Sequence, residues 1–287
     1  MRDAVAKVPA ITVGFWIVKI LATTLGETGG DAVSMSWLGE TTPDAGASGI
    51  NGYLVGTAIF GLVLLVLVWM QVRANRFNRW LYWATIVAST TAGTTLADFA
   101  TRSLGIGYAG GSALLFACVL GSLFVWRSMT GSVANDSVDS PRSEGFYWLT
   151  ITFSQTLGTA LGDWVADSRL GYGGAAIIFS ALLAVTAILY FWTRVSRVLL
   201  FWAAFILTRP LGATVGDFLD KPIAKGGLEI SRSLATVVLM TAILILIAIL
   251  PQRAASKRHE QGGSRAPMLA SGRAIAAVSS SAHVFGN

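Results

Sequence analysis

Residues 15–31 read FWIVKILATTLGETGGD, and residues 147–163 read YWLTITFSQTLGTALGD. The second segment repeats the first in its aromatic pair, its central glycine and its final aspartate. The same pattern begins again at Trp83 and at Trp202, so the chain has four copies. Counted from the tryptophan, each copy has Gly at offset 10 and Asp at offset 15. Four related apolar segments therefore each contain one carboxylate.

The composition of the chain is that of an integral membrane protein. Of its 287 residues, 54% are hydrophobic and 13% are charged, and the mean hydropathy is +0.64. These values exclude an ordinary soluble domain. Apolar stretches long enough to span a bilayer as a helix occur eight times: residues 9–30, 53–71, 80–103, 106–127, 146–167, 173–193, 198–219 and 228–250. Because these stretches lack the alternation of barrel strands, we expect an all-α bundle of eight transmembrane helices.

The repeats divide the chain into four tandem units, each predicted to contain two transmembrane helices. The units cover residues 8–71, 80–127, 146–193 and 198–250. Two spans per unit give all four units the same orientation, as parallel repeats. The first helix of each unit carries the polar residues. We therefore expect the four first helices to surround a common axis and the apolar second helices to face lipid.

Three segments outside the predicted helices are polar. Residues 36–52 are expected to form an external flap, and residues 128–145 are expected to link the two halves of the chain. Residues 252–287 are rich in Ser, Ala, Gly and basic residues, which predicts a disordered cytoplasmic tail. Attachment of this tail to anionic lipids is the alternative.

Basic residues and tryptophans indicate the orientation. Of the 21 basic residues, 14 lie on the side that contains both termini and the loops between units. The positive-inside rule makes that side the cytoplasm. Eight tryptophans lie near the same boundary and are expected to form an interfacial belt: Trp16, Trp69, Trp80, Trp83, Trp126, Trp148, Trp192 and Trp202.

Polar side chains form a stripe along the first helices, because helical periodicity brings offsets 8, 11 and 15 onto one face. Offset 8 is a threonine in three copies: Thr24, Thr91 and Thr156. Offset 11 is Glu27 in the first copy. Offset 15 is the aspartate of each copy: Asp31, Asp98, Asp163 and Asp217. Carboxylates and hydroxyls are ligands of hard cations, so we predict a metal site formed by the four aspartates and Glu27, with the threonines completing the substrate site.

The fourth copy departs from the pattern, because it has Arg209 and Pro210 where the first has Thr23 and Thr24. An arginine at this depth needs a partner, and Glu27 is the one carboxylate without a counterpart in the other copies. We therefore expect an Arg209–Glu27 pair and include Arg209 in the substrate site. With Lys19 as a second base, the embedded charges are five acids against two bases, an excess that favours a multivalent cation or protons.

Structural interpretations of the same residues stay open. The glycines at offset 10 are typical of close helix packing in membranes. The aspartates could instead end the helices near the headgroups and pair with Arg102, Arg169 and Lys221. Neither histidine lies in the repeats, and no phosphate-binding loop or nucleophile–base pair is visible. We therefore expect no enzymatic activity and no zinc or copper(I) site.

The repeated segments resemble a family of bacterial multi-pass membrane proteins. Trp16, Thr24, Gly26, Gly30 and Asp31 carry the resemblance in the first copy, and the third copy matches them from Trp148 to Asp163. Members of this family have four copies of a short repeat of unknown function. The resemblance implies a multi-pass protein of the bacterial inner membrane and names no activity.

The leading functional hypothesis is a transporter for a hard multivalent metal cation, acting as an exporter or a proton-coupled exchanger. A transporter of small organic cations or zwitterions is the first alternative, with tryptophans providing cation–π contacts. A membrane scaffold or sensor that transports nothing is the second. The expected partners are the lipid bilayer and a metal cation or proton. We expect no nucleic acid and no resident cofactor, and the sequence leaves homo-oligomerisation open.

Overall fold

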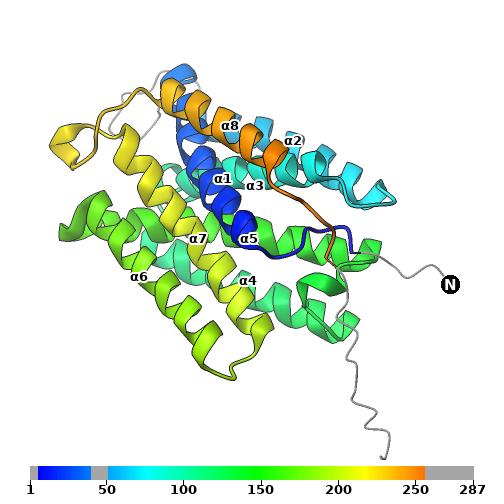
Figure 1. The fold of residues 1–287 in the computed structure, drawn as a ribbon. Helices are drawn as coiled ribbons and strands as arrows, with labels where there is room; N and C mark the ends of the chain where they lie inside the picture. Colours follow the sequence, from blue (N-terminus) through cyan, green and yellow to red (C-terminus); the bar gives the residue numbers. More distant parts are fainter. Residues whose placement is uncertain (1–5, 40–50, 256–287) are drawn as a thin grey trace, which may run out of the picture. The chain divides into compact units, whose positions relative to one another are not determined.

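The computed structural model describes residues 6–39 and 51–255, except for the side chains of Arg169 and Lys225. Most of the predicted flap and residues 256–287 of the predicted tail lie outside these ranges. The described chain is all-α and contains no strand, as predicted. Its α-helices are α1 (Val13–Asp31), α2 (Gly52–Arg73), α3 (Arg79–Asp98), α4 (Tyr108–Thr130), α5 (Pro141–Val165), α6 (Gly171–Trp192), α7 (Arg197–Asp220) and α8 (Arg232–Ile249) (Figure 1).

The first helices of the four copies form a closed inner ring. Helix α1 packs against α3, α3 against α5, α5 against α7, and α7 against α1. Most of their residues from offset 7 to offset 15 are buried. The prediction that the first helices surround a common axis is therefore confirmed. The side chains at the centre of the ring are buried between the helices.

Glycine sets the spacing of this ring by the same contact repeated four times. Each glycine at offset 10 lies against the residue at offset 7 of the next copy. The pairs are Gly26 with Thr90, Gly93 with Gln155, Gly158 with Arg209, and Gly212 with Thr23. An added Cβ would approach its nearest neighbour to between 2.1 Å and 2.9 Å, so any side chain would push the helices apart. Close packing, the structural interpretation of these glycines, is confirmed.

The second helices cover the ring from outside. Helix α2 packs against α3, α4 against α5, α6 against α7, and α8 against α1. Each outer helix therefore lies chiefly on the inner helix of the next copy, and the last one closes onto the first. Their outward side chains are large and apolar, such as Leu65, Phe124 and Ile177 at 69%, 72% and 72% exposure. Apolar exposure on this scale indicates a surface that lipid covers.

Five of the described helices are long and apolar enough to cross a membrane: α2, α4, α6, α7 and α8. The sequence predicted eight such spans, and α1, α3 and α5 do not reach the same apolar composition. These three helices belong to the inner ring and carry threonine, serine and glycine on their buried faces, whereas α7, the fourth ring helix, has a more apolar first half. The five apolar helices and the covered polar ring together indicate a membrane protein.

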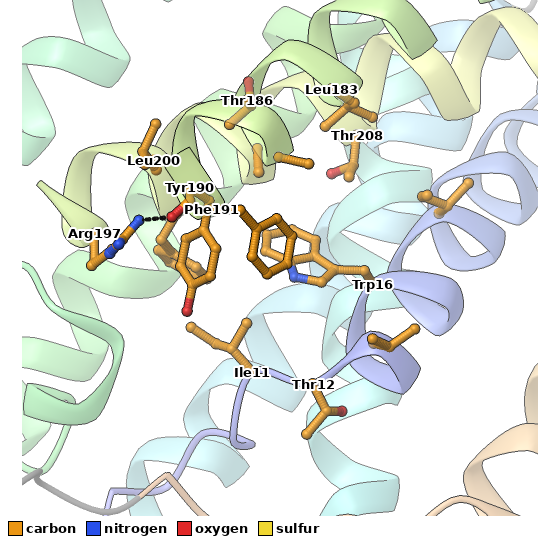
Figure 2. A pocket seen from close by; sticks show the side chains of 15 residues that line it. Ile11, Thr12, Trp16, Leu183, Thr186, Tyr190, Phe191, Arg197, Leu200 and Thr208 are labelled. Carbon is orange, nitrogen blue, oxygen red and sulfur yellow. Dashed lines mark hydrogen bonds between the residues drawn. The ribbon is translucent and has the colours of Figure 1, made fainter. Parts of the chain in front are cut away.

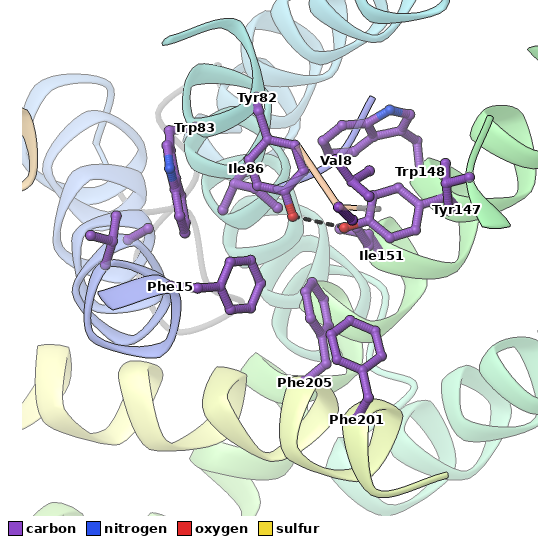
Figure 3. Close-up of a cluster of buried hydrophobic side chains, with 14 of the residues drawn as sticks. Val8, Phe15, Tyr82, Trp83, Ile86, Tyr147, Trp148, Ile151, Phe201 and Phe205 are labelled. Atoms are coloured by element: carbon purple, nitrogen blue, oxygen red, sulfur yellow. Dashed lines mark hydrogen bonds between the residues drawn. The ribbon is translucent and has the colours of Figure 1, made fainter. Parts of the chain in front are cut away.

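Aromatic side chains close the ring at its tryptophan end. The residue before each tryptophan lies on the tryptophan of the next copy: Phe15 on Trp83, Tyr82 on Trp148, Tyr147 on Trp202, and Phe201 on Trp16. We call these eight residues the aromatic seal; Figure 3 labels Phe15, Tyr82, Trp83, Tyr147, Trp148 and Phe201 among them. The Tyr82 and Tyr147 hydroxyls lie 2.7 Å apart and form a hydrogen bond across it.

The prediction that eight tryptophans form an interfacial belt is wrong for those that are buried in the bundle. Trp83, Trp126, Trp148 and Trp202 are buried in the core, whereas Trp69, Trp80 and Trp192 are exposed. The inward tryptophans are large enough to fill the end of the ring, so burial there outweighs their interfacial preference. Only the exposed tryptophans remain suited to an interfacial belt.

Three segments, residues 6–10, 131–140 and 252–255, pack against the aromatic seal, and the order of residues 252–255 corrects one sequence prediction. The 128–145 segment is more than a linker: the Val133 carbonyl accepts a hydrogen bond of 2.9 Å from Trp202 Nε1, and Asn135 donates one to the Pro9 carbonyl. Residues 252–255, predicted to be disordered, pair through their backbone with residues 8–10. An ion pair of 2.7 Å between Lys7 and Glu144 also joins the first of these segments to α5.

Burial raises the pKa of the Glu144 carboxyl, and the nearby Lys7 ammonium opposes that shift.

We predict that side chains at offset 10 destabilise the bundle. Gly212→Val should lower the thermal unfolding midpoint in detergent, because its Cβ would lie 2.1 Å from Thr23 Oγ1 and overpacking costs about 1–3 kcal/mol. Gly121→Val on α4 is the matched control, since nothing lies within 4 Å of its Cβ position. Equal midpoints for the two variants would contradict the interlocked ring.

Candidate cation site on the bundle axis

An ion pair between α1 and α7 lies at the centre of the inner ring. Arg209 Nη1 lies 3.0 Å from Glu27 Oε2, and both side chains are almost completely buried. The predicted Arg209–Glu27 pair is confirmed. The fourth copy has Ala213 at offset 11, the offset of Glu27. Because the alanine side chain is small, the Arg209 side chain has room to reach Glu27.

Threonines from the other two inner helices complete this layer. Thr94 on α3 and Thr159 on α5 donate to Glu27 Oε2, at 3.2 Å and 3.4 Å. Arg209 Nη2 donates to the same hydroxyls, at 2.5 Å and 2.6 Å. Because α1 and α5 are not neighbours in the ring, the contact between Glu27 and Thr159 places the site on the axis.

The guanidinium of Arg209 is bound by backbone as well. Its two terminal nitrogens donate to the carbonyls of Thr23 and Thr90, at 3.2 Å and 3.3 Å. Thr94 and Thr159 also belong to this site, although they were not among the predicted site residues. The available signal was their offset, which is the offset of Glu27.

The threonines at offset 8 donate to their own helices in the described structure. Thr24, Thr91 and Thr156 are buried, but each hydroxyl donates to a carbonyl of its own helix four residues earlier, at 3.1 Å, 2.9 Å and 3.0 Å. The described contacts do not bring them to Glu27 or to the aspartates. Offsets 7 and 8 differ by about 100° around a helix, and the structure turns offset 7 toward the next helix.

The four aspartates form the next layer, and two basic residues bridge them in pairs. Arg102 lies 3.0 Å from both Asp98 and Asp163. Lys221 lies 2.5 Å from Asp31 and 3.0 Å from Asp217. Arg102 and Lys221 are two of the three bases that the sequence offered as ion-pair partners of the aspartates. The third is Arg169, whose side chain is not among those that the structure describes.

The bridges change the predicted charge balance. The bases near Glu27 and the four aspartates are Lys19, Arg102, Arg209 and Lys221; a further buried acid nearby, Asp220, lies 3.4 Å from Arg232 and is balanced by it. Five acids against four bases replace the predicted five against two, which leaves one negative charge in excess. The signal in the sequence was a base four residues after Asp98 and after Asp217, where it returns to the same helix face.

Two groups of carboxylates are close enough to bind one cation each. Oxygens of Glu27, Asp163 and Asp217 lie within 4.8 Å of one another, and so do oxygens of Asp31, Asp217 and Asp220. All these residues are buried. The first group draws on three different inner helices, and its oxygen-only donor set suits magnesium, calcium or manganese.

Irregular helix follows three of the aspartates. The π-helical segments Ala32–Trp37 and Phe99–Ser103 start directly after Asp31 and Asp98, and Ala166–Leu170 starts just beyond Asp163. Such segments are rare and occur often at functional sites. They lie directly beyond the level of the aspartates, and the third also contains a kink at Ser168.

Lys19 lies between the aromatic seal and Arg209. It is fully buried, and its Nζ lies 4.2 Å from the centre of the Phe205 ring. Among the described residues its amine has no hydrogen-bond acceptor. Lys19 is therefore the basic group on the axis that no acid holds.

Comparison with known proteins identifies the repeat. The family described as Repeat of Unknown Function (DUF347) matches four times, at residues 14–77, 81–131, 146–196 and 200–253. No curated protein and no solved structure matches the chain.

We predict that Arg209 and Glu27 stabilise the bundle only together. Arg209→Ala should leave Glu27 as an unpaired buried acid, at a cost of about 3–5 kcal/mol. Combining it with Glu27→Gln should recover part of the loss, measured as the fraction that stays monodisperse after heating in detergent. Arg127→Ala, at an exposed arginine of α4, is the control. If the double variant is no more stable than Arg209→Ala, the pair does not carry this energy.

Proposed function

The chain belongs to this repeat family, whose description gives no activity, and we propose that it is a membrane transporter for a hard multivalent cation. One observation carries the proposal: Glu27, Asp163 and Asp217 converge from three helices inside the bundle, with oxygens within 4.8 Å of one another. Carboxylates at such depth are costly in a membrane and mark ion pathways by default. Their hard oxygens suit a divalent ion better than a soft metal.

All eight helices cross the bilayer in this proposal. Helix α1 has 19 residues and covers about 28 Å at ~1.5 Å per residue, close to the ~30 Å of a hydrocarbon core. The π-helical segment after it lengthens the run to Trp37. The ring of outer helices shields the polar faces of α1, α3 and α5 from lipid. The excess of basic residues on one side favours a cytoplasmic location of both termini, and a bacterial inner membrane is part of this proposal.

The bases on the axis act as internal substitutes for the transported cation. Arg209 neutralises Glu27, and Lys221 and Arg102 neutralise the aspartates, so the pathway is stable without an ion. An entering cation exchanges with these bases for Glu27, Asp163 and Asp217. The displaced Arg209 then turns to its threonine and carbonyl acceptors, which are already within hydrogen-bond distance.

Protons are the coupling ions in this proposal. Lys19 lies next to Arg209 along the axis and lacks an acceptor among the described residues, so it is free to exchange a proton as the arginine moves. In this proposal the aromatic seal closes the pathway beyond Lys19. With ion pairs at one end and the seal at the other, the described conformation is closed at both ends.

A membrane scaffold or sensor is the second candidate, because every aspartate of the ring has a basic partner. In that case the charges serve assembly alone. A transporter of organic cations is less favoured. The inward tryptophans are packed into the aromatic seal, at the end of the ring away from the aspartates, and are not placed to contact a cation there.

We predict that Asp163→Asn and Asp217→Asn abolish transport in reconstituted vesicles while the protein still folds. The amide keeps the volume and removes the charge that a cation needs. Uptake of magnesium, calcium and manganese would be measured in vesicles. Asp167→Asn is the control, because Asp167 is exposed and belongs to neither carboxylate group. Transport at the wild-type rate by both ring variants would leave the scaffold candidate.

Cysteine labelling tests the topology. Cys118 is the sole cysteine of the sequence, so Cys118→Ser provides a background without thiols. In it, Leu104→Cys should react with a membrane-impermeant maleimide on intact cells, and Arg142→Cys only after permeabilisation. Both positions are exposed. The reverse pattern would invert the orientation, and labelling of both in intact cells would exclude the single membrane span, α4, that the proposal places between them.

A further inference from the structure

A cavity of about 700 Å³ lies between α1, α6 and α7, away from the axis. Its wall is mainly apolar and includes Trp16, Leu183, Phe191 and Phe201 (Figure 2). Thr186 and Thr208 also line it, but their hydroxyls donate to carbonyls of their own helices, at 2.9 Å and 2.8 Å. The cavity therefore offers an apolar surface on the outer, lipid-facing side of the ring.

A positive charge marks one end of the cavity. Arg197 lines it at the start of α7 and is exposed. Its guanidinium lies 4.4 Å from the centre of the Tyr190 ring and donates to the Tyr190 carbonyl (Figure 2). No ion pair forms between Arg197 and an acid of the described chain. These contacts hold the guanidinium in place and leave further donors for an anion.

The level of Arg197 corresponds to a membrane boundary. Phe191 and Trp192, at the end of α6, are exposed at 76% and 79%. Exposed tryptophans are typical of the headgroup region. From this end the cavity extends along the helices to Leu183 and Thr208, toward the interior of the bilayer.

We propose that this cavity binds one acyl chain of a phospholipid whose phosphate lies on Arg197. The apolar wall matches the chain, the guanidinium matches the phosphate, and their order along the helices matches the order of the two groups in a lipid. The bound lipid fills the space where the fourth copy meets the first and braces α7 against α1. This proposal requires a membrane location and is independent of cation transport.

A photoactivatable phosphatidylglycerol, with a diazirine on one acyl chain, tests the proposal in vesicles of purified protein. Cross-links mapped by mass spectrometry should concentrate on peptides of α6, α7 and the start of α1. Ala187→Phe, which fills the cavity, should reduce them several-fold. Ala113→Phe on α4 is the matched control, since both alanines are exposed on outer helices. Equal labelling of all outer helices, or no effect of Ala187→Phe, would overturn the proposal.

The phosphate contact is tested separately. Arg197→Gln should lower the affinity for the probe roughly tenfold, the loss expected for one charge-assisted contact. Arg194→Gln, at a nearby exposed arginine that does not line the cavity, should leave it unchanged. A diacylglycerol probe with the same chains should bind both variants and the wild type equally weakly. Equal binding of phospholipid and diacylglycerol by the wild type would contradict recognition of a phosphate.

Discussion

The guanidinium of Arg209 contacts every other inner helix. It belongs to α7, pairs with Glu27 on α1, and donates to Thr94 on α3 and Thr159 on α5. A buried arginine without partners would be prohibitive in a membrane, so this position requires the other three helices to approach it closely. The glycines at offset 10 permit that approach. The ring, its outer cover and the aromatic seal all depend on this polar centre being satisfied from within.

The packing contacts between the inner helices repeat four times, whereas the charged residues on the axis differ from copy to copy. The glycine contacts and the aromatic contacts recur in all four copies, each time between one copy and the next. The axial layers differ: one copy supplies Glu27, another Arg209, and the bridging bases Arg102 and Lys221 come from the second and fourth copies. Four similar backbones therefore hold different side chains around one axis. Such a division allows a fold to stay constant while its central site becomes asymmetric.

The repeat offsets alone were enough to predict which helices form the centre and that Glu27 meets Arg209. The offsets could not show whether Thr23 or Thr24 faces the neighbouring inner helix, because the two are adjacent and both are threonines. The rotation of the helix that decides this depends on packing between copies. The offsets also missed that α2 covers α3, since the pattern pairs each helix with its neighbour inside a copy. The burial of Trp83 and Trp148 was missed for a related reason: a tryptophan near a membrane boundary has the same sequence signature whether it faces lipid or the axis.

The central claim is that three carboxylates on the axis can exchange their basic partners for a cation. The most direct measurement is an experimental structure with manganese, using anomalous scattering to locate the ion. The account predicts a peak among Glu27, Asp163 and Asp217, with Arg209 and Lys221 moved away from them. A structure at saturating manganese with all ion pairs intact and no peak on the axis would contradict it.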